Sequence, residues 1–307
     1  MVRNVFLRFL QAILVLLGCA LLIFIMLRII PGNPIAVLMG EHADVDVIKR
    51  MTTELGLDQP ILVQFFRYIW GAVRGDFGTS FSLGKPVSSV LASAFVNTLI
   101  LALFAAVFAW GLGIITGIIA AVKKNSLLDH LFMGVSLLGV SMPVFMVAML
   151  LQYFLAYSLK LFPISGTKSF LGFILPAIAL GWNSAGSVAR LVRSTLLDVL
   201  EEDYIDTARA KGRGQMGVLI LHALRNAMLP VITMMAMQLS GLLSGAVITE
   251  TVFAINGIGR LAVQAITARD IPLLQGTVLL SAAVVVIGNF LADSLYNVLD
   301  PRIRREG

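Results

Sequence analysis

The chain has 307 residues and a formal net charge of +6, but only 13% of its residues are charged and 58% are hydrophobic. Soluble domains average about 25% charged residues, because their surfaces must be covered with polar groups. This composition therefore excludes a soluble enzyme, a disordered chain and a disulfide-rich secreted module. With a mean hydropathy of +0.93, an integral membrane protein in contact with lipid remains. The basic excess is typical of Lys and Arg retained on the cytoplasmic side and does not indicate a nucleic-acid partner.

Six runs without charged side chains are long enough to cross a membrane, because a helix needs about 20 apolar residues to span about 30 Å of hydrocarbon. In chain order the runs are Phe9–Leu27, Pro86–Val122 (apolar from about Thr98), Leu131–Leu159, Ser169–Ala189, Asn226–Thr249 and Ile271–Ala292. The sequence therefore predicts an all-α integral membrane protein with six transmembrane helices. The distribution of Lys and Arg between the segments places both termini in the cytoplasm.

These runs divide the chain into three predicted parts. Residues 1–30 contain the N-terminus and the first spanning helix, and residues 31–97 form an external cap segment. Residues 98–307 form a five-helix core with a cytoplasmic loop at 190–228.

Within this loop, residues 201–212 predict a short helix. The acidic residues Glu201, Glu202, Asp203 and Asp206 come first, and the basic residues Arg209 and Lys211 come last. This order complements the helix dipole, and Gly212 suits the left-handed position that ends a helix.

One side of this predicted helix is apolar, because Tyr204, Ile205 and Ala208 follow one another at helical spacing. The stripe could pack on the protein's own helix ends or on the membrane surface. It could equally dock into a groove on a cytoplasmic partner. The residues alone favour neither interpretation.

Several motifs along the whole chain resemble those of one transporter family. The cytoplasmic loop contains Glu202-Asp203-Tyr204, Thr207-Ala208-Arg209-Ala210-Lys211-Gly212 and His222-Ala223-Leu224-Arg225-Asn226-Ala227-Met228-Leu229-Pro230. Outside it stand Pro31-Gly32-Asn33-Pro34, Gly75-Asp76-Phe77-Gly78-Thr79-Ser80, Ser141-Met142-Pro143, Thr249-Glu250-Thr251-Val252-Phe253 and Ala268-Arg269-Asp270-Ile271-Pro272. In this order they resemble the permeases of ATP-binding-cassette (ABC) importers, in particular the dipeptide, oligopeptide, glutathione and nickel group.

The resemblance implies a type I ABC-importer permease fold in a bacterial plasma (inner) membrane. It implies a second homologous permease, two cytoplasmic ABC ATPase subunits that carry ATP and Mg, and an external solute-binding protein. The residues expected to couple the chain to the ATPases are Glu202, Tyr204, Thr207, Ala208, Arg209, Ala210, Lys211 and Gly212.

Three places depart from the family pattern. Asn33 stands where aspartate is usual, Ile271 where tyrosine is usual, and Ala254-Ile255-Asn256 where Trp-Pro is commoner. All three lie in or near predicted outer loops, so they bear on the substrate and on the binding protein.

The chain carries no recognisable catalytic or metal-binding constellation. It has no G-x-x-x-x-G-K-[ST] phosphate loop, and its three histidines, His42, His130 and His222, have no Cys or carboxylate partners at metal-ligand spacing. We therefore expect a transport subunit without its own ATPase site, cofactor or metal. An ion-coupled secondary transporter is the alternative, although the charge-poor spans and the lack of a visible repeat disfavour it.

Uncharged polar residues near or within the spans are the candidates for a substrate pathway: Asn97, Asn183, Gln238, Ser240 and Ser244. Hydrogen bonds between helices are the competing role for such residues. Small residues at helical spacing, including Gly113, Gly117 and Gly241, predict close helix packing.

Overall fold

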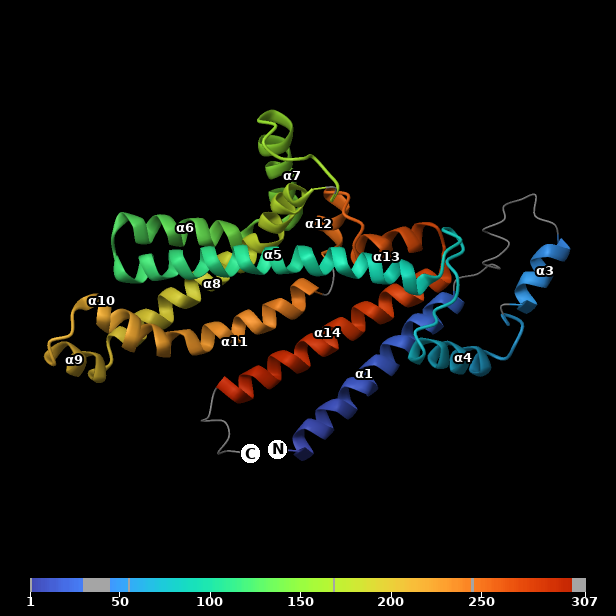
Figure 1. The fold of residues 1–307 in the computed structure, drawn as a ribbon, viewed down its shortest axis with the longest axis horizontal. Helices are drawn as coiled ribbons and strands as arrows, with labels where there is room; N and C mark the ends of the chain where they lie inside the picture. The colour runs from blue at the N-terminus through green and yellow to red at the C-terminus, as the bar shows by residue number, and fades with distance from the viewer. Residues whose placement is uncertain (1, 30–44, 55, 168, 244–245, 300–307) are drawn as a thin grey trace. The chain divides into compact units, whose positions relative to one another are not determined.

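The structure is a computed structural model that describes residues 2–29, 45–54, 56–167, 169–243 and 246–299. Its helices begin with α1 (Val2–Ile29), α3 (Val45–Glu54), α4 (Ile61–Val73), α5 (Val87–Val122), α6 (Leu127–Ser141), α7 (Val144–Leu151), the π-helix η1 (Gln152–Ser158) and the 3₁₀ turn η2 (Phe170–Phe173). They continue with α8 (Ile174–Leu200), α9 (Asp203–Ala210), α10 (Gln215–Val218), the π-helix η3 (Leu219–Ala223), α11 (Leu224–Leu243), α12 (Val247–Val252), α13 (Ile258–Thr267) and α14 (Ile271–Leu299) (Figure 1). Within these ranges no strand forms beyond one isolated bridge between Thr79 and Pro86, so the predicted all-α fold is confirmed.

Five described helical segments are long and apolar enough to cross a membrane: Leu10–Ile29, Val87–Val122, Phe170–Leu200, Gln215–Leu243 and Ile271–Phe290. The expected span over Leu131–Leu159 is different, because two helical segments, Leu127–Ser141 and Val144–Ser158, meet there at a bend of 109°. The run is therefore helical, but it is broken in the middle. The total reaches six only if the bent pair counts as one span.

The break lies at Met142 and Pro143. Met142 is extended, with ψ of 131°, and Pro143 precedes the first residue of α7 with φ of −60° and ψ of 138°. Proline has no N–H to continue the ladder of α6 and disfavours helical geometry in the residue before it. As a result α6 lies along α5 while α7 turns away from it (Figure 1).

The chain forms two compact units. Unit 1 comprises Met1–Thr98 and Asn256–Ile287, and unit 2 comprises Leu99–Ile255 and Gly288–Gly307. The division into residues 1–30, 31–97 and 98–307 stays a prediction. Within the predicted cap, residues 31–44 lie outside the described residues, as does the Asn33 departure.

Unit 2 is organised around α8, which packs against α5, α6, α7 and α11. Glycines permit the close approach: a Cβ added at Gly113 would lie 2.7 Å from Cβ of Val188, and one added at Gly186 would lie 2.5 Å from the carbonyl oxygen of Ser136. Close packing through Gly113 and Gly117 is thus confirmed. Gly241 has open space around it, so the prediction fails there.

Unit 1 contains a separate apolar cluster. Val87 and Leu91 of α5 pack with Ile258 of α13 and with Leu273 and Leu274 at the start of α14, and all five are almost fully buried. This cluster holds the beginnings of three helices together.

The contact of α5 with α8 gives a prediction that two glycines of the same helix can test. A Cβ at Gly117 would lie 2.6 Å from the carbonyl oxygen of Ala189, whereas one at Gly111 meets nothing within 4 Å. Gly117→Ala should therefore lower the free energy of unfolding by about 1–3 kcal/mol through overpacking. Gly111→Ala should leave it unchanged or raise it by up to about 1 kcal/mol. Thermal unfolding in detergent measures both, and equal midpoints for the two variants would contradict the packing described here.

Candidate functional site

The short helix expected in the loop at 190–228 is present as α9. Asp203 and Asp206 lie in its first turn and Arg209 in its last, which is the favourable order for the helix dipole. Gly212 has φ of +78°, the left-handed conformation that glycine adopts without strain, and its N–H donates to the carbonyl of Arg209 over 3.0 Å.

One face of α9 is buried against its own chain. Ile205 is 0% exposed and Ala208 is 8% exposed, within an apolar cluster shared with the end of α5, with α8 and with the segment from α10 to α11. Packing on the protein's own helices is therefore the correct interpretation for these two members of the stripe. Burying an isoleucine side chain is worth about 1.5–3 kcal/mol, which fixes α9 to the helices around it.

Tyr204 lies at the edge of this buried face. It is 40% exposed, and its hydroxyl accepts a hydrogen bond from the side-chain amide of Asn226 over 2.8 Å. This bond links α9 to α11 at a second point.

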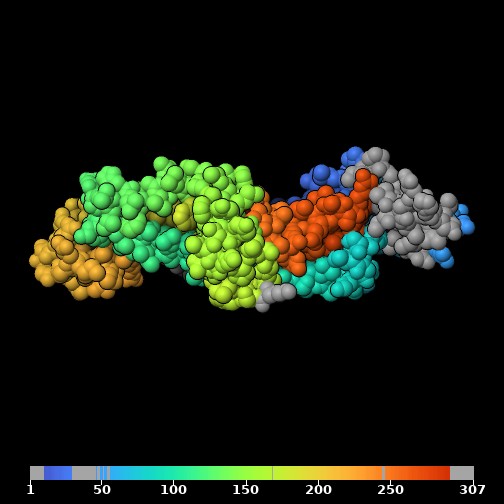
Figure 2. Space-filling model, turned by 90° about the horizontal axis from the view of Figure 1, so that it is seen from above, coloured from blue at the N-terminus to red at the C-terminus, as the bar shows by residue number. Residues whose placement is uncertain are grey.

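The other face of α9 is open. Of the predicted coupling residues, Ala208 alone is buried, and the exposed ones are Glu202, Tyr204, Thr207, Arg209, Ala210, Lys211 and Gly212. Asp206 and Arg209 form an ion pair of 2.8 Å whose side chains are 73% and 50% exposed, so it adds little stability. Figure 2 shows α9 and α10, in gold, at the surface of unit 2. We define Thr207, Arg209, Ala210 and Lys211 as the outer face of α9.

Sequence reasoning missed a buried ion pair at the same end of unit 2. Nε and a terminal nitrogen of Arg193 in α8 donate to the two carboxylate oxygens of Asp129 in α6, over 2.6 and 2.7 Å. The Asp129 side chain is only 3% exposed and that of Arg193 is 27% exposed. The N–H of Asn125 also donates to Asp129, over 2.9 Å. The two residues lie 64 positions apart, so no local pattern marks them as partners.

This ion pair should matter more than an exposed one nearby, Lys124 with Glu201, whose side chains are 48% and 71% exposed. Asp129→Ala should cost about 3 kcal/mol, because it leaves Arg193 partly buried without its carboxylate. Lys124→Ala should cost less than about 1 kcal/mol. The double replacement Asp129→Leu with Arg193→Met should recover most of the loss. Unfolding in detergent measures all three, and equal losses for the two single variants would contradict this assignment.

The predicted substrate-pathway residues fall into two groups, apart from Ser244, which lies outside the described residues. Asn97 donates to the backbone carbonyl of Asn256 over 3.0 Å, and Asn183 to that of Val140 over 3.1 Å. Val140 is close to the end of α6, where carbonyls lack helical partners, so Asn183 satisfies one of them at the break before Pro143. Bonds of this kind favour the packing role for Asn97 and Asn183.

Gln238 and Ser240 differ from the two asparagines. Oε1 of Gln238 and Oγ of Ser240 are buried without a hydrogen-bond partner among the described residues. Ser240 is 3% exposed and faces Gly288, where an added Cβ would lie 2.8 Å from the Ser240 hydroxyl. A role in a pathway stays a prediction for all these residues.

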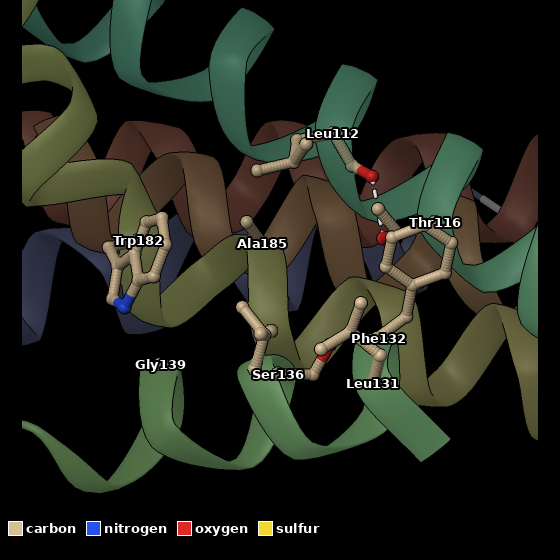
Figure 3. Close-up of a pocket in the computed structure, with 10 residues that line it drawn as sticks. Leu112, Thr116, Leu131, Phe132, Ser136, Gly139, Trp182 and Ala185 are labelled. Carbon is tan, nitrogen blue, oxygen red and sulfur yellow. Dashed lines mark hydrogen bonds between the residues drawn. The ribbon is translucent and has the colours of Figure 1, made fainter. Parts of the chain in front are cut away.

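An apolar cavity of about 290 Å³ lies between α5, α6 and α8 (Figure 3). Its lining consists of Leu112, Thr116, Leu131, Phe132, Val135, Ser136, Gly139, Trp182, Ala185 and Gly186. The Thr116 hydroxyl donates to the carbonyl of Leu112 over 2.7 Å, and the indole nitrogen of Trp182 lacks a partner within the described ranges. None of the lining side chains titrates, so the cavity suits an apolar group and offers no acid–base chemistry.

In the described parts of the chain, no three His, Cys, Asp or Glu side chains come together in a geometry that could hold a metal ion. The lone Cys19 is partly buried in α1.

Unit 1 contains a buried carboxylate, Asp270, at the start of α14. It is 0% exposed and accepts hydrogen bonds from the Ser80 hydroxyl (2.6 Å), the Ser82 hydroxyl (2.8 Å) and N–H (2.9 Å), and the N–H of Leu273 (3.2 Å). Burial would raise the pKa of Asp270, but these bonds outweigh it and hold the pKa below the ordinary value. The carboxylate thus ties the turn before α5 to the start of α14.

With this geometry in place, two family models match the chain. Residues 113–305 match the binding-protein-dependent transport system inner membrane component, and residues 1–102 match the N-terminal part of the corresponding membrane component. The chain belongs to this family. It is therefore a permease of a bacterial inner membrane, and the predicted family and location are confirmed.

Similar proteins cover nearly the whole permease. The dipeptide transport system permease protein DppB of Escherichia coli (strain K12) is 40% identical over 94% of this chain and 95% of its own. The glutathione transport system permease protein GsiC of Salmonella paratyphi A is 42% identical over 99% of both chains.

Solved structures support the fold independently of close sequence similarity. Two inward-facing structures of the MetNI methionine ABC transporter match 69% of this chain and 96% of theirs, with TM-scores of 0.57 and 0.59 at 17% and 16% identity. The predicted type I ABC-importer permease fold is thereby confirmed. The permease is a subunit of an ABC importer, and this implies ATPase and substrate-binding partners.

Proposed function

We propose that this permease moves peptides into the cytoplasm as part of an assembly with a second homologous permease, two cytoplasmic ABC ATPases and an external solute-binding protein. The observation that carries the proposal is the identity of about 40%, over at least 94% of the chain, to permeases named for dipeptide and glutathione transport. Dipeptides and oligopeptides are the first choice of cargo, with glutathione, itself a peptide, as the second. None of these names supports a nickel chelate.

The chemistry of ATP belongs to the partners in this proposal. The sequence has no phosphate loop, so ATP and Mg bind to the ATPase subunits, and this chain needs neither a cofactor nor a catalytic residue. Both termini and the loop that contains α9 lie on the cytoplasmic side, where the ATPases are.

The outer face of α9 is the contact with an ATPase. Exposed side chains can meet a partner, whereas Ile205 and Ala208 are committed to the chain's own cluster. Because that cluster includes the end of α5, α8 and the start of α11, a displacement of α9 moves these helix ends together. The Asp129–Arg193 pair extends the connection to α6. Movement of the ATPases on ATP binding thus reaches four helices through one short helix.

Uptake into vesicles tests the function. Vesicles that contain the assembled transporter and its binding protein should accumulate labelled dipeptide when ATP is supplied to the ATPases. A proton gradient without ATP should drive no uptake. Uptake driven by the gradient alone would overturn the proposal in favour of the ion-coupled secondary transporter.

Cysteine crosslinking tests the outer face of α9. In a Cys19→Ser background, Thr207→Cys and Ala210→Cys should each capture an ATPase subunit with a short crosslinker, because both positions are exposed on α9. Ser165→Cys is the matched control, since Ser165 is also exposed but lies on the predicted outer side. Absence of capture from both α9 positions in a complex that transports normally would remove α9 from the contact.

A further inference from the structure

Unit 1 contains a groove of about 500 Å³ between the beginning of α5 and α13. Its polar lining consists of Lys85, Ser89, Ser93, Asn256 and Gln264, and apolar side chains fill the rest. The volume lies within the range of about 300–1,000 Å³ that is typical of small-molecule sites. The surrounding segment, 31–97, is the predicted external cap.

The groove is held open by hydrogen bonds behind its walls. Asn97 of α5 donates to the carbonyl of Asn256, and the N–H of Ile258 donates to the Thr98 hydroxyl over 2.9 Å. On the other side, the N–H of Val87 donates to the carbonyl of Gly78 over 2.9 Å. These bonds fix the segment at the start of α13 and the turn before α5 to α5 itself, so the groove is formed before any ligand arrives.

Its chemistry is that of an anion site. Lys85 is the one titratable side chain in the lining, and no hydrogen bond or ion pair connects its ammonium group to another described residue. Oδ1 of Asn256 accepts a bond from Arg260 over 3.1 Å, which leaves the amide N–H groups of Asn256 to donate. The Gln264 amide adds further donors. No carboxylate lines the groove to compete for them.

The start of α5 does not supply this positive character. The N–H groups of Val87, Ser89 and Val90 already donate to carbonyls, and the hydroxyls of Ser89 and Ser93 donate to backbone oxygens. The donors that remain are therefore Lys85 and the two amides, which is a suitable set for a carboxylate.

We propose that this groove binds the terminal carboxylate of a peptide on the external side of the membrane, with Lys85 as the charged contact. The inference rests on the proposed peptide-import function. A small concave pocket fits the end of a short ligand better than the flat surface of a folded partner.

The test uses the complete transporter with its binding protein in vesicles and two labelled probes, Ala-Ala and its C-terminal amide. Lys85→Met should raise the half-saturating concentration of Ala-Ala about 3- to 10-fold, as expected for a charge-assisted contact made by an exposed side chain. It should leave the value for the amide unchanged, and Lys85→Arg should restore most of the loss for Ala-Ala. Lys160→Met is the matched control, because Lys160 is exposed on the predicted outer side but outside the groove.

Each outcome decides the question. The binding protein's preference for one probe over the other is the same for wild type and variant. It therefore cancels when the half-saturating concentration of one probe is compared between wild type and variant. An equal rise for both probes would assign Lys85 to the binding-protein contact or to the fold and would overturn the subsite, as would no change for either. If Lys85→Met fails to assemble, Gln264→Leu takes its place with the same expectations. Wild-type vesicles that import neither probe, and no oligopeptide or glutathione either, would refute the proposed function itself.

Discussion

In hydrocarbon no water is available to a backbone carbonyl, and this constraint governs how the permease is built. Long helices satisfy it for most residues, but α6 ends before Pro143 inside a segment of otherwise apolar sequence. There the side-chain amide of Asn183 donates to the carbonyl of Val140. Such a bond requires α8 to approach α6 closely, and the absence of a Cβ at Gly186, opposite the backbone of Ser136, permits it. The break before Pro143, the hydrogen bond from Asn183 and the close approach at Gly186 therefore depend on one another.

The sequence predicted the features that depend on local patterns. Charge-free runs located five spanning segments, and the order of charges together with Gly212 located α9. It did not predict the break at Pro143, because a count of apolar residues contains no information on backbone direction. Proline was visible in the sequence, and its missing N–H was the available signal.

Features that depend on tertiary contact could not be read from the sequence. Asp129 and Arg193 lie 64 positions apart, so no local pattern marks them as partners and only folding brings them together. Ser80 and Asp270 belong to two motifs recognised separately, which the sequence could not pair. The apolar stripe of α9 was visible, but which side it would face depended on a cluster assembled from three other stretches of chain.

The two faces of α9 have a consequence for how transporters diversify. Ile205 and Ala208 hold the helix in place through the buried cluster, whereas the residues of the outer face are exposed and outside that cluster. Substitutions on the outer face alone could thus adapt the permease to a different ATPase subunit without any change in its interior packing. Related importers could then exchange ATPase subunits, in nature or by engineering, through changes of surface residues on one helix of eight residues.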